Sequence, residues 1–174
     1  MNREVEVSSK INLKVVDQLP AAAGSYALHL RLARPAALDV GRLGRFGFPA
    51  GDYFYLGSAR GPGGLRARLR HHLSVSARPH WHIDALTRRA EITGIWYSEG
   101  PAALECLWSQ ALYSLPLAVC AAPGFGAADC PSGCPAHLAA FPRDGSLKAV
   151  EWALRAVLPV GQSLQSIRGS AHQI

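Results

Sequence analysis

The stretch DYFYLGSA at residues 52–59 is rich in aromatic and aliphatic side chains, which is typical of a β-strand. Because side chains alternate between the two faces of a strand, Tyr55 and Gly57 are predicted to share one face. Upstream, the alternating stretch GSYALHLRL at residues 24–32 predicts a second strand, with Tyr26 and three leucines on one face. These two strands are the clearest secondary-structure predictions in the chain.

Helices are predicted on the carboxyl side of these strands. Leu65, Leu69 and Leu73 fall four residues apart and place one apolar stripe on a helix over residues 65–73. The other predicted elements are a hairpin connection or distorted strand pair over 41–51, a helix over 81–89, a strand over 92–97, a helix opened by Gly100 and Pro101, a loop over 124–135, and a helix or strand over 146–158.

The two ends of the chain give weaker patterns. Residues 1–21 are predicted to form an N-terminal extension or an edge strand, because Ile11, Leu13 and Val15 alternate with other residues. Residues 143–174 are predicted to form a C-terminal element that packs on the domain, and the composition from residue 162 onward is typical of a disordered tail. The central domain is then expected to span residues 22–142.

The composition is that of a folded protein of one domain. The chain has 174 residues, of which 49% are hydrophobic and 17% charged, so it can bury a sizeable core. Its apolar stretches are too short to cross a bilayer, and residues 1–10 are not followed by the apolar core of a signal peptide. We therefore expect a cytoplasmic protein that does not enter membranes and whose four cysteines are free thiols.

Positive charge is concentrated between residues 60 and 89. This segment holds seven arginines and one acid, so its net charge is seven minus one, or +6. A GC-rich coding sequence would explain the preference for arginine over lysine but not this clustering. Arginines attract a phosphate backbone through counterion release and bidentate contacts, so the segment predicts nucleic-acid binding, with DNA favoured over RNA. The residues expected to contact nucleic acid are Arg60, Arg66, Arg70, His71, His80 and His82.

Five residues are candidates for catalysis. Arg68 and His72 lie four apart on the predicted helix and could both reach one phosphate, although a solvated basic face has the same pattern. Glu105 falls in the first turn of a helix, where it could offer an oxygen to a hard cation or simply favour the helix dipole. Tyr26 and Tyr55 lie on different strands, where tyrosine is usually a core residue.

The order of these residues resembles a known family. Residues 24–26 (Gly-Ser-Tyr) and 55–57 (Tyr-Leu-Gly) resemble the paired Gly-Ile-Tyr and Tyr-Ile-Gly motifs of the GIY-YIG nuclease superfamily. In that family an arginine on the next helix, a His or Tyr four residues later and a glutamate on a later helix complete the site. Arg68, His72 and Glu105 match those positions in order and in type of element.

Longer strings resemble one branch of that superfamily, whose members occur alone or fused to endonuclease III-type DNA glycosylases. The resemblance covers residues 22–142. The strings are GDYFYLGSA at 51–59, GGL at 63–65, ARL at 67–69, HWHID at 80–84, GFG at 124–126, Asp-Cys at 129–130 and His-Leu at 137–138.

The resemblance implies an α+β fold, with a small antiparallel sheet of about three strands flanked by helices. It also implies a metal-dependent endonuclease that hydrolyses nucleic-acid phosphodiesters in DNA repair or processing. A single Mg²⁺ or Mn²⁺ would be held by Glu105, and water would be the nucleophile. Tyr26 or Tyr55 would act as general base or relay, and Arg68 would stabilise the pentavalent phosphate. The alternative is a module of the same fold that binds nucleic acid without cutting it.

A short histidine string offers a further set of polar groups. His80, His82 and Asp84 alternate, so an extended segment would place all three side chains on the same side. They could bind a metal ion, contact phosphate or cap the helix that follows, and the sequence does not separate these roles.

The loop after residue 120 carries an incomplete zinc pattern. Cys130, Cys134 and His137 form a Cys-x3-Cys-x2-His cluster, whereas closed structural zinc sites have four ligands. Cys106 or Cys120 could supply the fourth ligand in space. The sequence favours the other interpretation, a structural loop folded against the entrance of the active site.

Overall fold

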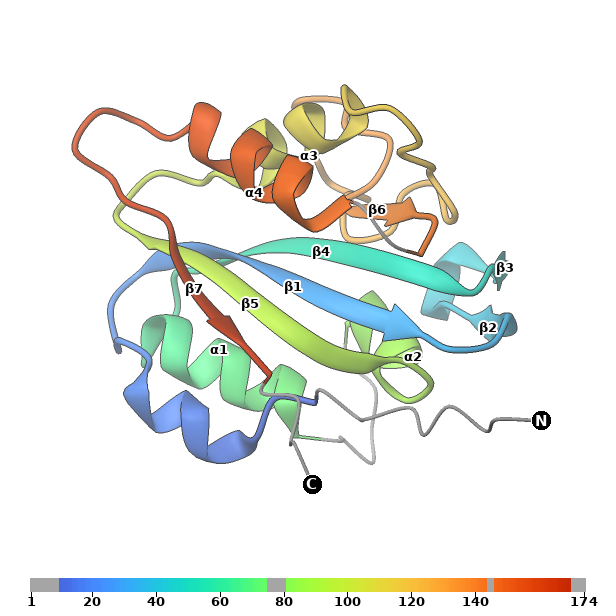
Figure 1. The fold of residues 1–174 in the computed structure, drawn as a ribbon, viewed down its shortest axis with the longest axis horizontal. Helices are drawn as coiled ribbons and strands as arrows, with labels where there is room; N and C mark the ends of the chain where they lie inside the picture. Colours follow the sequence, from blue (N-terminus) through green and yellow to red (C-terminus); the bar gives the residue numbers. More distant parts are fainter. Residues whose placement is uncertain (1–9, 75–80, 144–145, 170–174) are drawn as a thin grey trace.

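A five-stranded antiparallel sheet forms the centre of the computed structural model, which describes residues 10–74, 81–143 and 146–169 (Figure 1). The strand order is β6-β4-β1-β5-β7. The strands are β1 (Gly24–Leu32), β4 (Gly51–Ala59), β5 (Glu91–Glu99), β6 (Leu138–Phe141) and β7 (Gln165–Arg168). In the described ranges, no helix has the length and apolar character needed to cross a membrane.

Helices cover both faces of this sheet (Figure 1). One face carries the 3-10 helix η1 (Leu13–Gln18), α1 (Gly64–Leu73) and α2 (His82–Thr87), and the other carries α3 (Glu105–Tyr113) and α4 (Ser146–Ala156). A short 3-10 helix, η2 (Gly41–Leu43), separates β2 (Ala36–Asp39) from β3 (Arg45–Phe48), and these two strands pair antiparallel. The connection or strand pair expected over residues 41–51 therefore begins earlier, because β2 lies before residue 41. The α+β class is therefore confirmed.

The two central strands are buried on both faces because alternate side chains enter two separate cores. Tyr26, Leu28 and Leu30 of β1 pack on the α1 and α2 side, and Ala27 packs on the α3 and α4 side. In β4, Tyr53 and Tyr55 likewise enter the first core, whereas Phe54 and Leu56 enter the second. This alternation is what the two aromatic stretches predicted.

The expectation of about three strands was wrong, because the sheet has five. Strand β6 is four consecutive buried residues, so it has no alternation from which a strand could be recognised. Strand β7 is mostly exposed and lies in the tail that was expected to be disordered. It is held by main-chain pairing with β5 from Gly94 to Tyr97, which composition does not reveal.

Of the two alternatives for residues 1–21, an extension or an edge strand, the described residues 10–21 contain no strand. Leu13–Gln18 forms a 3-10 helix, and the side chain of Asn12 caps it by accepting a hydrogen bond from the Lys14 N–H at 3.0 Å. Val16 and Leu19 are buried against the first core. Three alternating apolar residues were too short a pattern to separate a strand from a capped turn of helix.

Candidate active site

A pocket of about 420 Å³ lies at the edge of β4, past the point where β6 begins at Leu138, opposite Tyr55. β6 pairs with β4 only from Asp52 to Tyr55. The Leu56 N–H still donates to the His137 carbonyl, just before β6, at 2.8 Å, and Leu56, Gly57 and Ser58 line the pocket. The neighbouring chain joins β4 only up to Leu56, and this leaves room for a ligand beside a central strand.

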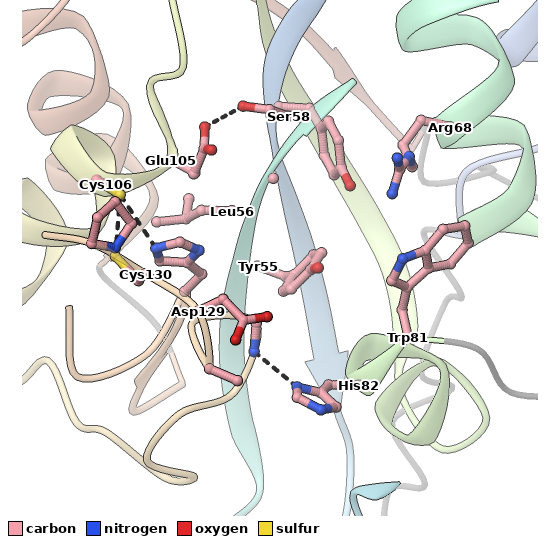
Figure 2. A pocket seen from close by; sticks show the side chains of 16 residues that line it. Tyr55, Leu56, Ser58, Arg68, Trp81, His82, Glu105, Cys106, Asp129 and Cys130 are labelled. Atoms are coloured by element: carbon pink, nitrogen blue, oxygen red, sulfur yellow. Dashed lines mark hydrogen bonds between the residues drawn. The ribbon is translucent and has the colours of Figure 1, made fainter. Parts of the chain in front are cut away.

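Four of the five catalytic candidates line this pocket, namely Tyr26, Tyr55, Arg68 and Glu105. Figure 2 shows Arg68 and Glu105 on opposite sides of β4. Arg68 comes from α1, on one face of the sheet, and Glu105 comes from the first turn of α3, on the other. The strand edge is thus the place where side chains from the two helical layers converge.

Two contacts orient the charged residues of the pocket. The hydroxyl of Ser58 donates a hydrogen bond to Oε2 of Glu105. The guanidinium of Arg68 lies over the ring of Trp81, 4.6 Å from its centroid, in a cation–π contact. Both charged groups are therefore held by neighbours that also line the pocket.

The tyrosine pair follows from the strand register. Tyr26 lies opposite Gly57 and Tyr55 opposite Leu28, so the two tyrosines are diagonal neighbours on one face. Their ring centroids are 6.4 Å apart. A Cβ atom on Gly57 would lie 2.5 Å from the Tyr26 Oη, so the Tyr26 side chain occupies the space that the glycine leaves open. The glycine of the Tyr-Leu-Gly motif is needed for this close approach.

Replacing Gly57 with alanine is expected to lower the free energy of unfolding by about 1–3 kcal/mol, the usual cost of overpacking a core. The buried Tyr26 ring cannot move aside freely, because it packs against Tyr55 and His72. Urea denaturation measures the change. The matched control is Gly47→Ala, since a Cβ at Gly47 has no atom within 4 Å. Equal losses in the two variants would contradict this account.

Burial dominates the ionisation of both tyrosines. It raises the pKa of Tyr55 to about 12, and the nearby Arg68 only partly opposes this. Burial also raises the pKa of Tyr26 well above its usual value, with a further contribution from Tyr55. Both side chains are therefore neutral phenols at neutral pH in the protein without a bound cation.

His72 lies behind the pocket rather than in it. Its Nε2 atom is 2.8 Å from the Tyr26 Oη, and its ring is buried against the rings of Tyr26 and Tyr55. Burial lowers the pKa of His72 to about 3, with smaller contributions from His71 and Arg68. A neutral imidazole in this position can orient the Tyr26 hydroxyl but does not present a charge to a phosphate.

The low pKa of His72 predicts that the protein loses stability in mild acid. Below the unfolded pKa of about 6.5, the unfolded chain binds a proton at His72 that the native protein excludes. The free energy of unfolding should therefore fall by roughly 1 kcal/mol per pH unit from about pH 6.5 toward the folded pKa of about 3.

Urea denaturation at a series of pH values from 7 downward measures this slope. The variant His72→Gln should lose the contribution, whereas His71→Gln, which keeps His72, should retain it. An unchanged slope in His72→Gln would show that other groups cause the acid sensitivity.

The residues expected to contact nucleic acid do not all face the pocket. His82 lines it, and its Nδ1 accepts a hydrogen bond from the Gly126 N–H at 3.1 Å. Arg66 donates from Nε to the Leu19 carbonyl at 2.7 Å, and Arg70 pairs with Asp17. These two arginines connect α1 to the N-terminal segment and do not line the pocket.

The remaining candidates of this group are more varied. Arg60 is exposed directly after the end of β4. His71 is half-buried and packs against Trp81 with ring centroids 4.4 Å apart. His80 lies outside the described residues, and Asp84 accepts a hydrogen bond from the Trp81 N–H at 3.0 Å. Asp84 thus caps α2, which is one of the roles expected for it.

Three further residues of the pocket were not predicted as site residues: Ser58, Trp81 and Asp129. Ser58 directly follows the Tyr-Leu-Gly motif, and Trp81 lies inside the HWHID string, so both positions carried a signal. Asp129 is exposed on the loop facing β4 and gives the pocket a second carboxylate beside Glu105. Carboxylate oxygens are the protein ligands of Mg²⁺ and Mn²⁺, so the chemistry of these donors fits a hard divalent cation.

The cysteine and histidine residues of the loop gather at one wall of the pocket, which Cys106, Cys130 and His137 line. Cys130, Cys134 and His137 are joined by Cys106, and their four ligand atoms all lie within 4.8 Å of one another. Of the two cysteines that could have completed the pattern, the structure places Cys106, in the first turn of α3, in the cluster. Sequence spacing could not choose between Cys106 and Cys120.

The fold and the pocket together define an α+β protein with a polar pocket at the edge of a central strand. Comparison with known families identifies a match to the family described as "Domain of unknown function DUF123" over residues 25–158. The chain belongs to this family, whose match includes all the pocket residues from Tyr26 to His137. No curated protein and no solved structure matches the chain.

Proposed function

We propose that this chain is a metal-dependent endonuclease of the GIY-YIG type that hydrolyses nucleic-acid phosphodiesters. The observation that carries the proposal is the convergence of Tyr26, Tyr55, Arg68 and Glu105 in one pocket, although they come from four different elements. Each residue alone is more often structural than catalytic. A pocket that combines an arginine, a carboxylate and two phenols has the groups that phosphoryl transfer requires.

Arg68 binds the phosphate of the substrate and stabilises the charge of its pentavalent transition state. A guanidinium can donate two parallel hydrogen bonds to phosphate oxygens, and it remains charged at every relevant pH. The stacking of Arg68 on Trp81 holds it before the substrate arrives, so little side-chain entropy is lost on binding.

Glu105 is the proposed ligand of the cation, with Asp129 as a second carboxylate in the same pocket. When bound, Mg²⁺ or Mn²⁺ would act as a Lewis acid and would lower the pKa of a water molecule. The hydrogen bond from Ser58 fixes one oxygen of Glu105 and so aims the carboxylate at the pocket.

The tyrosines are proposed to position groups as neutral phenols. Because burial raises the pKa of Tyr55 to about 12 and that of Tyr26 in the same direction, neither is poised to be a general base by itself. A phenol can donate to a phosphate oxygen or accept from the attacking water. His72, on the far side of Tyr26, orients that hydroxyl.

We propose DNA as the partner. We also propose that the protein acts in DNA repair or processing, within the cytoplasm. The test is a cleavage panel of single-stranded, duplex and flapped DNA and of RNA, each incubated with Mn²⁺, with Mg²⁺ or with chelator. We expect metal-dependent cleavage, with DNA cut faster than RNA. Salt-sensitive binding that chelator does not affect, with no product on any substrate, would instead identify a binding module.

A further inference from the structure

The four ligand atoms beside the pocket have the spacing of a tetrahedral zinc site. The Sγ atoms of Cys106 and Cys130 are 3.4 Å apart, and Cys106 Sγ is 3.7 Å from His137 Nε2. Zn–S bonds of about 2.3 Å at tetrahedral angles place two sulfurs about 3.8 Å apart. A disulfide would instead bring two sulfurs to about 2.05 Å. All four donor atoms lie within 4.8 Å of one another, close enough to share one ion.

The chemistry of the donors favours zinc over the Mg²⁺ or Mn²⁺ that Glu105 is proposed to bind. Three thiolates and one imidazole form a soft ligand set, which suits Zn²⁺ and does not suit Mg²⁺. Cys134 and His137 are buried, whereas Cys106 and Cys130 are half-buried at the pocket wall. Four protein ligands leave no open position for a substrate, which is typical of a structural zinc site.

We propose that Cys106, Cys130, Cys134 and His137 bind one structural zinc ion. The ion would join the loop that contains Cys130 and Cys134 to the first turn of α3, from the residue directly after Glu105. This inference does not depend on the proposed nuclease activity, because the four ligands and their spacing are independent of any substrate.

The proposed zinc site explains why a loop with little regular structure can form one wall of the pocket. Gly126, at φ +70°, is so close to Tyr55 that a Cβ atom on it would lie 3.0 Å from the ring. The Gly126 N–H also donates a hydrogen bond to Nδ1 of His82, which lines the same pocket. A metal ion bound at the other end of the same loop would hold the loop, and therefore these two contacts, in place.

Metal analysis of the full chain, purified without a histidine tag and under reducing conditions, tests the proposal. We expect about one zinc per chain, falling to below about one tenth in Cys134→Ser and in Cys106→Ser, since removing a ligand opens a closed site. Cys120 is the matched control, because it is the remaining cysteine of the chain and lies outside the cluster. Cys120→Ser should therefore keep its zinc. A wild-type protein without zinc after incubation with Zn²⁺ would overturn the proposal.

A second measurement does not require the ligand variants to fold. Replacing the metal with Co²⁺ in the wild-type and Cys120→Ser proteins should give the intense visible absorption of tetrahedral thiolate coordination, at one cobalt per chain. A weak spectrum typical of six oxygen or nitrogen ligands would overturn the assignment. Loss of the cobalt spectrum in Cys120→Ser would overturn the choice of Cys106.

Discussion

Replacing Glu105 with glutamine is expected to lower the rate of metal-dependent DNA cleavage by about 100- to 1,000-fold, a loss of the size seen when one oxyanion-hole donor is removed. The amide has nearly the same shape as the carboxylate but carries no charge to hold a divalent cation. Single-turnover cleavage at saturating Mn²⁺ measures the rate, and thermal unfolding of the same preparation shows that the fold is kept.

The matched control for this change is Glu99→Gln. Glu99 is an exposed acid at the end of β5 and does not line the pocket, so its replacement removes the same charge from the same domain. We expect its cleavage rate to stay within a factor of about two of the parent, as for most surface substitutions. Equal rates for Glu105→Gln and the parent would exclude Glu105 as the metal ligand.

The zinc proposal and the nuclease proposal fail separately. If Glu105→Gln loses cleavage but keeps its zinc, the result supports catalysis by the pocket and agrees with a separate structural zinc site. A chain that binds zinc but cuts no substrate would keep the structural site and identify the pocket as a binding surface. Metal analysis should therefore accompany every cleavage assay.

The central strands could be predicted from sequence because their pattern is local. Alternation within residues 24–32 and 52–59 was enough to place Tyr26 and Tyr55 on strands, and the register then made them diagonal neighbours. The helix that carries Arg68 could likewise be predicted locally, from the leucines that recur every four residues over 65–73. Alternation could not show that β6 begins only opposite Tyr55, which leaves the rest of the β4 edge open to the pocket.

Features that depend on contacts between distant segments were the ones missed. Cys106 precedes Cys130 by 24 residues, so only the packing of α3 on the loop brings their sulfurs together. Strand β7 contributes only Ile167 to a core and is defined by its pairing with β5. The partners of Arg66 and Arg70 could not be predicted for the same reason, because a basic helix does not reveal which arginines contact another segment, here residues 17–19.

Replacing Arg68 with alanine is the second change for which we expect a large effect, a fall in the cleavage rate of about 100- to 1,000-fold with only a small loss of DNA affinity. Arg68 contributes one positive charge among many to ground-state binding, but it is the arginine that lines the pocket in the described part of the chain. Arg68→Lys should recover part of the rate, because it keeps the charge and loses the bidentate fork.

Arg70→Ala is the matched control for Arg68→Ala. Arg70 lies two residues away on the same helix, yet it is exposed and pairs with Asp17 on the N-terminal segment. Cleavage rate and DNA affinity, the latter from fluorescence anisotropy at several salt concentrations, separate the two roles. If Arg70→Ala lowered the rate as much as Arg68→Ala, the whole basic face of α1 would be acting through electrostatic attraction, and Arg68 would have no special place at the phosphate. A selective loss of rate in Arg68→Ala would place its guanidinium at the reacting phosphate, since general attraction would weaken binding in both variants alike.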